Sequence, residues 1–320
     1  MENIYAPRFQ NEDAAREHLE ALHWPNGPVC PHCESKATKR LPAQRGRKTK
    51  AHPDGKLRKG VVQCNDCRKQ FTVTVGTVFE RSKVPLHKWL LATHLLCSSK
   101  KGMSAHQLHR TIGVTYKTAW FMFHRIREAM RDDTNAPMGG EGGTVEADET
   151  YFGKNQLGPK TNRMAIRRMN RIVSLIDRAT GRASSIVFNG KFTAENVGKL
   201  LYTRVDRKSR LITDEAQSYK PVGRQFAAHE YVSHARDEYV RGDVTTNTVE
   251  GFFGIFKRGM RGIYQHCGQQ HLARYLAEFD FRYSNRAGRG VDDAKRTDLA
   301  LKGIAGKRLT YRRTDQACPA

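Results

Sequence analysis

Residues 144–154, with the sequence TVEADETYFGK, alternate between apolar and polar side chains near their start, and this alternation predicts a β-strand. Successive side chains on a strand point to opposite faces. Glu146 and Asp148 therefore share one face of the predicted strand, whereas Glu149 points to the other. The strand opens a series of elements that decides the fold class.

The segments that follow predict further strands and one helix. Residues 171–188, RIVSLIDRATGRASSIVF, predict two strands joined by a turn. We expect an amphipathic helix from about 193 to 205 with Thr193 as its N-cap, and then a strand in SRLITDEA (209–216) that ends at Asp214. One more strand is expected in AHEYVSH (228–234). The order of elements up to Asp214 is therefore βββαβ.

Residues 247–259, NTVEGFFGIFKRG, predict a helix whose surface is divided by chemistry. On a helical wheel Glu250 and Lys257 lie on one side, together with Asn247 and Gly254. The other flank carries four large apolar side chains, which are Val249, Phe252, Phe253 and Phe256. These four residues are expected to anchor the helix against a sheet, and the small Gly254 leaves room beside Glu250 for a bulky ligand.

Three acids from separated segments, Asp148, Asp214 and Glu250, can converge on divalent metal. Mg²⁺ prefers oxygen ligands, and a pair of such ions can align the attacking and leaving oxygens of a phosphodiester. Lys257 would then meet the phosphate backbone as a point charge. The alternative is three unrelated surface acids, since the chain has 32 acidic residues. The pattern of positions, rather than the count, favours the metal site.

Four of the seven cysteines form two CxxC pairs, Cys30 with Cys33 and Cys64 with Cys67. Two such turns close a tetrahedral Zn²⁺ site with no open position, which holds a fold and performs no chemistry. The spacing indicates a zinc ribbon, and the basic stretch RGRKTKAHPDGKLRKG (45–60) forms a loop between the two pairs. The alternative is a redox CxxC, which needs only one pair next to a βαβ pattern.

Residues 104–130, SAHQLHRTIGVTYKTAWFMFHRIREAM, predict a helix, a short turn around Gly113 and a second helix. Lys117, Arg125 and Arg127 lie off the expected apolar stripe of the second helix, and helix-turn-helix geometry would direct them to a DNA groove. A plain helical hairpin that packs against the next domain gives the same pattern. RDDTNAPMGGEGG (131–143) then breaks the periodicity and indicates a domain boundary.

The chain of 320 residues has 56 Lys and Arg against 32 Asp and Glu, a formal charge of +24. Such an excess points to a polyanionic partner, chiefly nucleic acid, while the alternative is a solvated basic surface kept for solubility. No apolar run approaches the roughly 20 residues that a membrane span needs, and the start of the chain lacks the pattern of a signal segment. We therefore expect a cytoplasmic protein without a membrane partner.

Several motifs agree in order and spacing with one family. After the zinc ribbon and helix-turn-helix come VEADETYFG (145–153), LITDEAQSYKP (211–221), NTVEGFFGIFKRGMRGIY (247–264) and HLARYLAEFDFRYSNR (271–286). Together they resemble a DDE transposase of a bacterial insertion sequence, in the group with an N-terminal zinc ribbon. The resemblance implies an α/β fold with a ribonuclease-H-like mixed sheet and flanking helices. The expected domains are a zinc ribbon with an N-terminal helix (1–82), a helix-turn-helix segment (83–132), a linker (133–143), the catalytic domain (144–290) and a basic C-terminal tail (291–320).

The resemblance also implies roles for single residues. Asp148, Asp214 and Glu250 would hold two catalytic Mg²⁺ or Mn²⁺ ions, with Lys257 as the basic residue that follows the third acid by seven. Some relatives use an asparagine in place of the glutamate, so Asn247 is the fallback ligand. Two arginines in RGMRG after this helix are expected to contact phosphates, the alternative being solvated charges; they are Arg258 and Arg261.

The implied activity is metal-dependent cleavage of double-stranded DNA at the terminal inverted repeats of an element, followed by transfer of the freed 3′-hydroxyl to target DNA. Because two ends must be brought together, the resemblance predicts a homo-oligomer. One rival is a nuclease on the same fold, which would cut without joining. A rival from another class is a non-catalytic regulator, or a domesticated remnant, that binds DNA through the ribbon and the helix-turn-helix.

Overall fold

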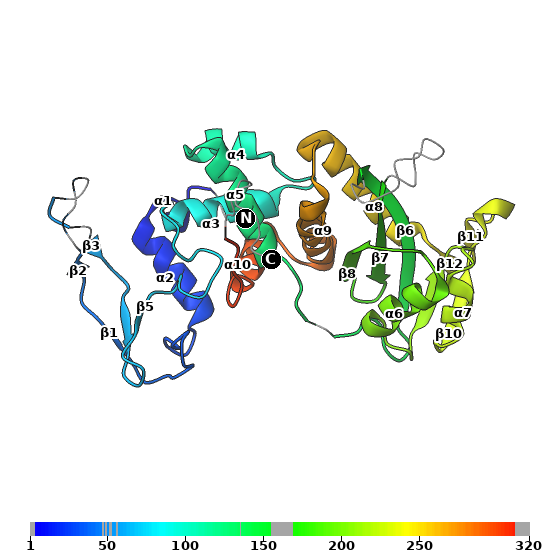
Figure 1. Ribbon diagram of the computed structural model, residues 1–320, viewed down its shortest axis with the longest axis horizontal. Helices are drawn as coiled ribbons and strands as arrows, with labels where there is room; N and C mark the ends of the chain where they lie inside the picture. The colour runs from blue at the N-terminus through cyan, green and yellow to red at the C-terminus, as the bar shows by residue number, and fades with distance from the viewer. Residues whose placement is uncertain are drawn as a thin grey trace, which may run out of the picture. The chain divides into compact units, whose positions relative to one another are not determined.

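The computed structural model describes residues 4–310 except 47, 49, 51, 52, 56, 135 and 155–168. The chain folds into two compact units, whose elements are labelled in Figure 1. The first unit contains Met1–Ser98, Ala105–Met130 and Asp293–Ala320, and the second contains Ser99–Ser104 and Arg131–Asp292. The chain therefore leaves the first unit and returns to it at its end.

The first unit begins with two helices and a small antiparallel sheet. Helices α1 (Pro7–Gln10) and α2 (Glu12–His23) meet at Asn11, whose side chain accepts two backbone N–H bonds and so caps α2. Strands β1 (Thr38–Arg40), β4 (Val62–Cys64) and β5 (Gln70–Phe71) form a sheet in the order β1-β4-β5. Between β1 and β4, the short strands β2 (Gln44–Arg45) and β3 (Leu57–Arg58) pair antiparallel, so the ends of the expected basic loop form a hairpin stem.

Three consecutive helices follow, α3 (Leu86–Ser98), α4 (Ala105–Ile112) and α5 (Tyr116–Ala129). The turn between α4 and α5 begins at Gly113, which adopts a φ of +63° that a glycine tolerates without strain. The Thr115 hydroxyl accepts the Thr118 amide and caps α5. The predicted order of helix, turn and helix is therefore present in the structure.

The last helix of the first unit, α10 (Asp293–Lys302), corrects the prediction of a basic C-terminal tail over 291–320. It packs against α3, where the Arg296 guanidinium donates to the Cys97 carbonyl at 2.9 Å and the Thr297 hydroxyl lies 3.0 Å from a ring nitrogen of His94. Ala300 and Leu301 are fully buried and give the helix an apolar face. That periodic face, rather than the basic composition, decides the structure, while residues 311–320 lie outside the described residues.

The second unit is built on a five-stranded mixed sheet in the order β10-β9-β6-β7-β8. The central strand β6 (Thr144–Lys154) pairs antiparallel with β7 (Met169–Asp177), which pairs antiparallel with β8 (Ala183–Phe188). On its other side β6 runs parallel to β9 (Arg210–Thr213), and β9 runs parallel to β10 (Ala228–Tyr231). Each of these strands was predicted from the sequence. The mixed sheet, with helices on both faces, confirms the expected fold class.

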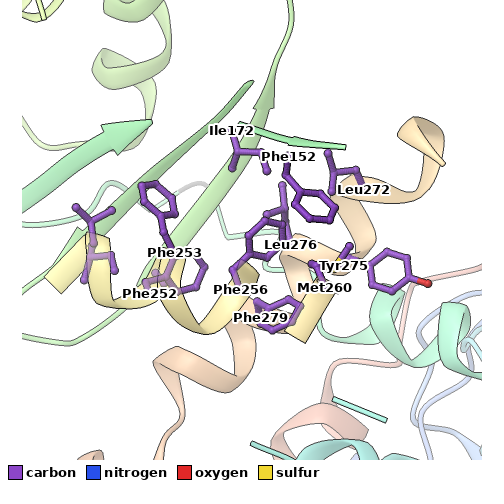
Figure 2. Close-up of a cluster of buried hydrophobic side chains, with 13 residues drawn as sticks. Phe152, Ile172, Phe252, Phe253, Phe256, Met260, Leu272, Tyr275, Leu276 and Phe279 are labelled. Carbon is purple, nitrogen blue, oxygen red and sulfur yellow. The ribbon is translucent and has the colours of Figure 1, made fainter. Parts of the chain in front are cut away.

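Alternation along the strands gives each face of this sheet its own apolar core. Phe152 and Ile172 pack against helices α8 (Asn247–Gly259) and α9 (Gln269–Ser284), as Figure 2 shows. Val145 and Ala147, one residue out of phase on β6, pack instead against helices α6 (Ala194–Arg204) and α7 (Tyr219–Gly223). The sheet is therefore covered on both sides, and its polar residues can reach solvent only at an edge or at a strand end.

Helix α8 is anchored as its sequence predicts. Its four large apolar side chains are 5% exposed or less, and they are Val249, Phe252, Phe253 and Phe256. Each such burial stabilises the fold by about 1.5–3 kcal/mol. A π-helical segment, η3 (Met260–Tyr264), continues α8. The remaining short elements of the second unit are η2 (His234–Arg236), the hairpin of β11 (Val240–Arg241) and β12 (Val244–Thr245), and η4 (Ala287–Arg289). The strong apolar flank fixes which side of α8 faces away from the sheet.

The segment predicted as a linker, 133–143, contributes to the second unit. The Met138 side chain is only 2% exposed and belongs to the core under α6. Its backbone bonds to Arg204 and Asp206, in a parallel bridge with Val205. The linker prediction is therefore wrong at Met138, because one apolar residue in a Gly-rich stretch is enough to dock it. In the part of the chain that the structure describes, no helix has the length and apolar character to cross a bilayer.

Candidate metal-binding sites

The four cysteines of the two CxxC pairs come together in the first unit. Their sulfur atoms all lie within 4.8 Å of one another, and Cys30 Sγ to Cys67 Sγ and Cys33 Sγ to Cys64 Sγ are each 3.6 Å. Four sulfurs at about 2.3 Å from a tetrahedral Zn²⁺ ion are separated by about 3.8 Å, whereas a disulfide would need about 2.05 Å. The cluster therefore fits zinc, as predicted, and has the closed sphere of a structural site.

Local structure prepares this site for metal. Both pairs lie at turns beside the small sheet, where Cys30 and Cys64 are buried against Val62 and Phe71. The backbone N–H groups of Cys67 and Asp66 point at the Cys64 sulfur and lower the pKa of that thiol to about 7. A lowered thiol pKa favours the thiolate, which is the form that binds a metal. Desolvation and the three neighbouring thiols instead raise the pKa of Cys33, so the geometry of the four sulfur atoms, rather than their ionisation, supports zinc.

A second cluster, which we call the acidic cluster, consists of Asp148, Glu149 and Asp214. One carboxylate oxygen from each residue lies within 4.8 Å of the others. The register of the parallel pair explains why Asp148 and Asp214 meet. The ladder runs from Thr144 opposite Arg210 to Glu146 opposite Ile212, and the same offset of 66 places Asp148 level with Asp214. Because β9 ends at Thr213, Asp214 stands where the ladder stops and the sheet edge opens.

Glu149 is the member of this cluster that the sequence did not predict. Alternation places it on the face opposite Asp148, and it does lie there, because the Tyr219 hydroxyl on α7 donates to its Oε2 at 2.9 Å. Its carboxylate nevertheless lies within 4.8 Å of the other two acids, and β9 has ended one residue before Asp214. The register of β6 with β9 was the missing information, and strand alternation alone does not provide it.

The electrostatics of the acidic cluster favour a cation. Burial, followed by repulsion from Asp214, raises the pKa of Asp148 to about 7, and the same two causes raise the pKa of Glu149 to about 7. Burial also raises the pKa of Asp214, against the opposing effects of the Ala216 amide and of His234. Two oxygens on opposite sides of one Mg²⁺ ion lie about 4.2 Å apart, so the observed spacing fits a divalent metal after small side-chain rotations.

Glu250, predicted as the third ligand, lies near this cluster but does not belong to the group of carboxylates whose oxygens are all within 4.8 Å of one another. It lies on the first turn of α8 with 45% of its side chain exposed, and its charge contributes to the raised pKa of Asp148. The Thr246 hydroxyl donates to Glu250 Oε1 at 2.6 Å, and His234 Nε2 lies 3.6 Å from the same oxygen. The three acids therefore share one neighbourhood, while the tight group contains Glu149 in place of Glu250. His234 carries no sequence signal that separates it from a structural histidine.

The other residues predicted on α8 occupy the expected side of the helix. Asn247 is the first residue of α8 and is exposed. Lys257 lies two turns after Glu250 and is half-buried, and Arg258 follows it with an exposed side chain. Arg261, in the π-helical segment, is also exposed. Four polar or basic side chains thus follow one side of α8 and its continuation.

Three basic residues of the helix-turn-helix were predicted to face a DNA groove, and the structure changes this prediction for two of them. Arg127 is only 2% exposed and its guanidinium lies 5.6 Å from the centre of the Phe123 ring, so the prediction that it faces a DNA groove is wrong. Arg125 is half-buried and donates to the carbonyls of Leu309 and Glu80 at 3.1 and 3.2 Å. Lys117 is exposed on the first turn of α5. The long aliphatic stems of arginine allow such burial, which a polar label in a periodicity pattern does not anticipate.

Comparison with known proteins adds to this geometry. Residues 141–284 match the model of the ISXO2-like transposase domain, and residues 10–70 match that of the transposase zinc-ribbon domain. A protein of Halobacterium salinarum, described as an uncharacterized protein in transposable element ISH50, is 30% identical over 294 residues, which cover 86% of this chain and 91% of the relative. A chain in the cryoEM structure of a simian T-cell lymphotropic virus intasome with the PP2A regulatory subunit B56 gamma is 16% identical. It aligns over 54% of this chain and 63% of its own length with a TM-score of 0.28, a likeness too weak to support an argument.

Proposed function

Because the chain belongs to the ISXO2-like transposases, we propose that it catalyses metal-dependent DNA cleavage and strand transfer at the ends of an insertion sequence. The observation that carries the proposal is the convergence of Asp148, Glu149 and Asp214 within 4.8 Å at the end of β9. Three repelling carboxylates in one place destabilise the metal-free fold, and such an arrangement is typical of sites that bind a cation.

In this proposal Asp148, Asp214 and Glu250 are the metal ligands. Two Mg²⁺ or Mn²⁺ ions, when bound, polarise the attacking and leaving oxygens of a phosphodiester. The raised pKa values of Asp148 and Glu149 mean that both acids give up protons when a cation binds near neutral pH. The hydrogen bond from Thr246 holds the carboxylate of Glu250 in one orientation and favours Glu250 over the fallback ligand, Asn247.

Basic side chains would hold the DNA. Lys257, two helical turns from Glu250, meets a phosphate beside the reacting one, and Arg258 and Arg261 extend the contact along the backbone. Lys117 on α5 contacts DNA separately, and Arg125 can do so only with the donors that its two carbonyl partners leave available. The zinc ribbon stabilises the first unit. In the cytoplasm, two copies of the chain bring the two terminal inverted repeats together before target DNA is attacked.

The alternative is a regulator or domesticated remnant that binds DNA without cutting it. The presence of Asp148, Asp214, Glu250 and Lys257 together favours the enzyme, since a protein that only binds DNA gains nothing from repelling acids in a basic surface. A nuclease on the same fold would cut DNA and leave the ends unjoined.

A strand-transfer assay tests the proposal. Purified protein is incubated with a labelled duplex that carries the terminal repeat, a supercoiled target plasmid and Mg²⁺ or Mn²⁺, beside Glu250→Gln and Asp214→Asn. The proposal predicts that label joins the plasmid with the wild type and with neither variant. Cutting without joining would support the nuclease, and DNA binding without any cutting in either metal would support the regulator or remnant.

A further inference from the structure

Glu146 is a buried carboxylate that the proposed reaction leaves without a role. It lies on β6 two residues before Asp148, on the same face, and its side chain is 0% exposed. A buried charge is costly unless it is paired and hydrogen-bonded, so its partners indicate what it does. They lie on α8 and in the turn after β7, far from Glu146 in the sequence.

Glu146 caps the helix that carries Glu250. Its Oε2 accepts the backbone N–H groups of Thr248 and Val249, each at 3.0 Å. These are amides of the first turn of α8, which have no partner within a helix and which a Ser, Thr, Asp or Asn at the N-cap position usually satisfies. Here a strand residue more than 100 positions earlier in the chain does so.

The residue at the N-cap position is therefore not needed as an acceptor for these two amides. Thr246 occupies this position and makes no side-chain capping bond. Its hydroxyl instead donates to Glu250 Oε1 at 2.6 Å. Because Glu146 already accepts the first-turn amides, the Thr246 hydroxyl is not required as their acceptor, and its orientation is set by the bond that it donates to Glu250.

Arg178 completes this arrangement. Its Nε donates to Glu146 Oε1 at 2.6 Å, and its two terminal nitrogens donate to the carbonyls of Asp243 and Thr245, each at 2.7 Å. The guanidinium therefore neutralises Glu146 and fixes the β11 to β12 hairpin, which leads directly into α8. The three hydrogen bonds of Arg178 therefore all act at the start of α8 or on the hairpin that precedes it.

We propose that Glu146, together with Arg178 and Thr246, is a positioning device that holds Glu250 toward Asp148 for metal binding. Glu146 itself touches neither metal nor DNA. It joins the strand of the first acid to the helix of the third, so that the separation of the two acids is fixed by hydrogen bonds and not only by apolar packing of α8. The inference rests on the proposed function, because it assumes that Glu250 is a metal ligand.

The test is a calorimetric titration of the zinc-loaded, full-length protein with Mn²⁺. Loss of an outer partner of a metal ligand lowers metal affinity by about 10- to 100-fold, and we expect at least a tenfold loss for Glu146→Ala. The matched control is Asp280→Asn, which removes another carboxylate of the second unit. Asp280 also accepts a backbone amide, that of Ser185 at 2.7 Å, but Ser185 lies on β8 and not on α8. We expect this control to bind Mn²⁺ within about twofold of the wild type, because distant sites act independently.

A double variant separates positioning from a direct effect. If Glu146 acts only through Glu250, then Glu146→Ala added to Glu250→Gln lowers Mn²⁺ affinity by no more than about twofold beyond Glu250→Gln alone. Additive losses would overturn the inference, as would wild-type Mn²⁺ affinity in a folded Glu146→Ala variant. Wild-type affinity in Glu250→Gln would instead remove Glu250 from the proposed ligands, and that outcome concerns the proposed function.

Thr246 provides a second pair of variants in case Glu146→Ala does not fold. Thr246→Val removes only the hydroxyl that holds Glu250, and Thr246→Ser retains it. We expect Thr246→Val to weaken Mn²⁺ binding by at least about fivefold and Thr246→Ser to restore it within about twofold. Equal affinities for both variants and the wild type would overturn the positioning role.

Discussion

Metal binding at the acidic cluster should depend steeply on pH between 6 and 8. Asp148 and Glu149 each have a pKa raised to about 7, first by burial and then by the charge of Asp214. If both acids must be ionised when a divalent ion binds, then protons compete with the metal below pH 7. Ordinary carboxylates, with pKa values near 4, would be fully ionised throughout this range and would give no such dependence.

The size of the effect follows from the two pKa values. At pH 6 each acid is about nine-tenths protonated and competition weakens apparent affinity by about 120-fold, against about 1.2-fold at pH 8. The apparent Mn²⁺ affinity should therefore rise about 100-fold from pH 6 to pH 8. In the metal-free protein the sign is opposite: folded-state pKa values above the unfolded ones mean that stability falls as the pH rises from about 4 to 7.

The assay is calorimetric titration of zinc-loaded protein with Mn²⁺ at pH 6, 7 and 8, in buffers of different ionisation enthalpy that report proton release. We expect about 1.8 protons released per binding event at pH 6 and about 0.2 at pH 8, and about half the pH 6 value for Glu149→Gln. Asp280, whose pKa burial also raises to about 7, lies outside the cluster, so Asp280→Asn should leave the dependence unchanged. An Mn²⁺ affinity that varies less than about threefold between pH 6 and pH 8 would refute the reasoning.

Three further predictions concern the core, the zinc site and the DNA contacts. Phe256→Ala should lower the free energy of unfolding of the second unit by about 3–5 kcal/mol in denaturant titrations, because this ring of α8 is fully buried and packs against Phe152 and Phe279. Cys33→Ser should reduce bound zinc, measured by elemental analysis, from one ion per chain to well below one and should lower the first thermal transition; full zinc content would contradict the four-cysteine site. Arg258→Ala should weaken DNA binding and reduce the slope of log affinity against log salt by about 0.9, whereas Lys199→Ala, on α6 and paired with Glu195, should leave the slope unchanged.

The sequence alone determined the elements whose signals are local. Alternation over 144–154 and the apolar flank of residues 247–259 gave β6 and α8 with the observed bounds, because burial of one face leaves a period in the sequence. Thr193 marked the start of α6, where its side chain accepts the Asn196 amide. Two CxxC turns were enough to predict the cysteine cluster, since each turn brings its own two sulfurs together.

Where the chain turned out differently, the deciding contacts come from distant segments. Arg127 is polar by composition and buried in the structure, since its aliphatic stem and guanidinium fit over Phe123. Residues 293–302 belong to the stretch 291–320 that was predicted as a basic tail, yet they form α10 on α3, about 200 positions away in the chain. Composition describes what a segment contains, and packing decides whether it has a partner.

The acidic cluster shows the same division within one site. The sequence identified Asp148 and Asp214 as acids at strand positions and Glu250 as an acid on a helix, and the family resemblance implied the same three residues. The offset of 66 between β6 and β9, which no local pattern encodes, decides that Asp148 and Asp214 stand level and that Glu149 joins them from the other face. Strand register is set by hydrogen bonds and side-chain packing between segments, so it exists only once the sheet has formed.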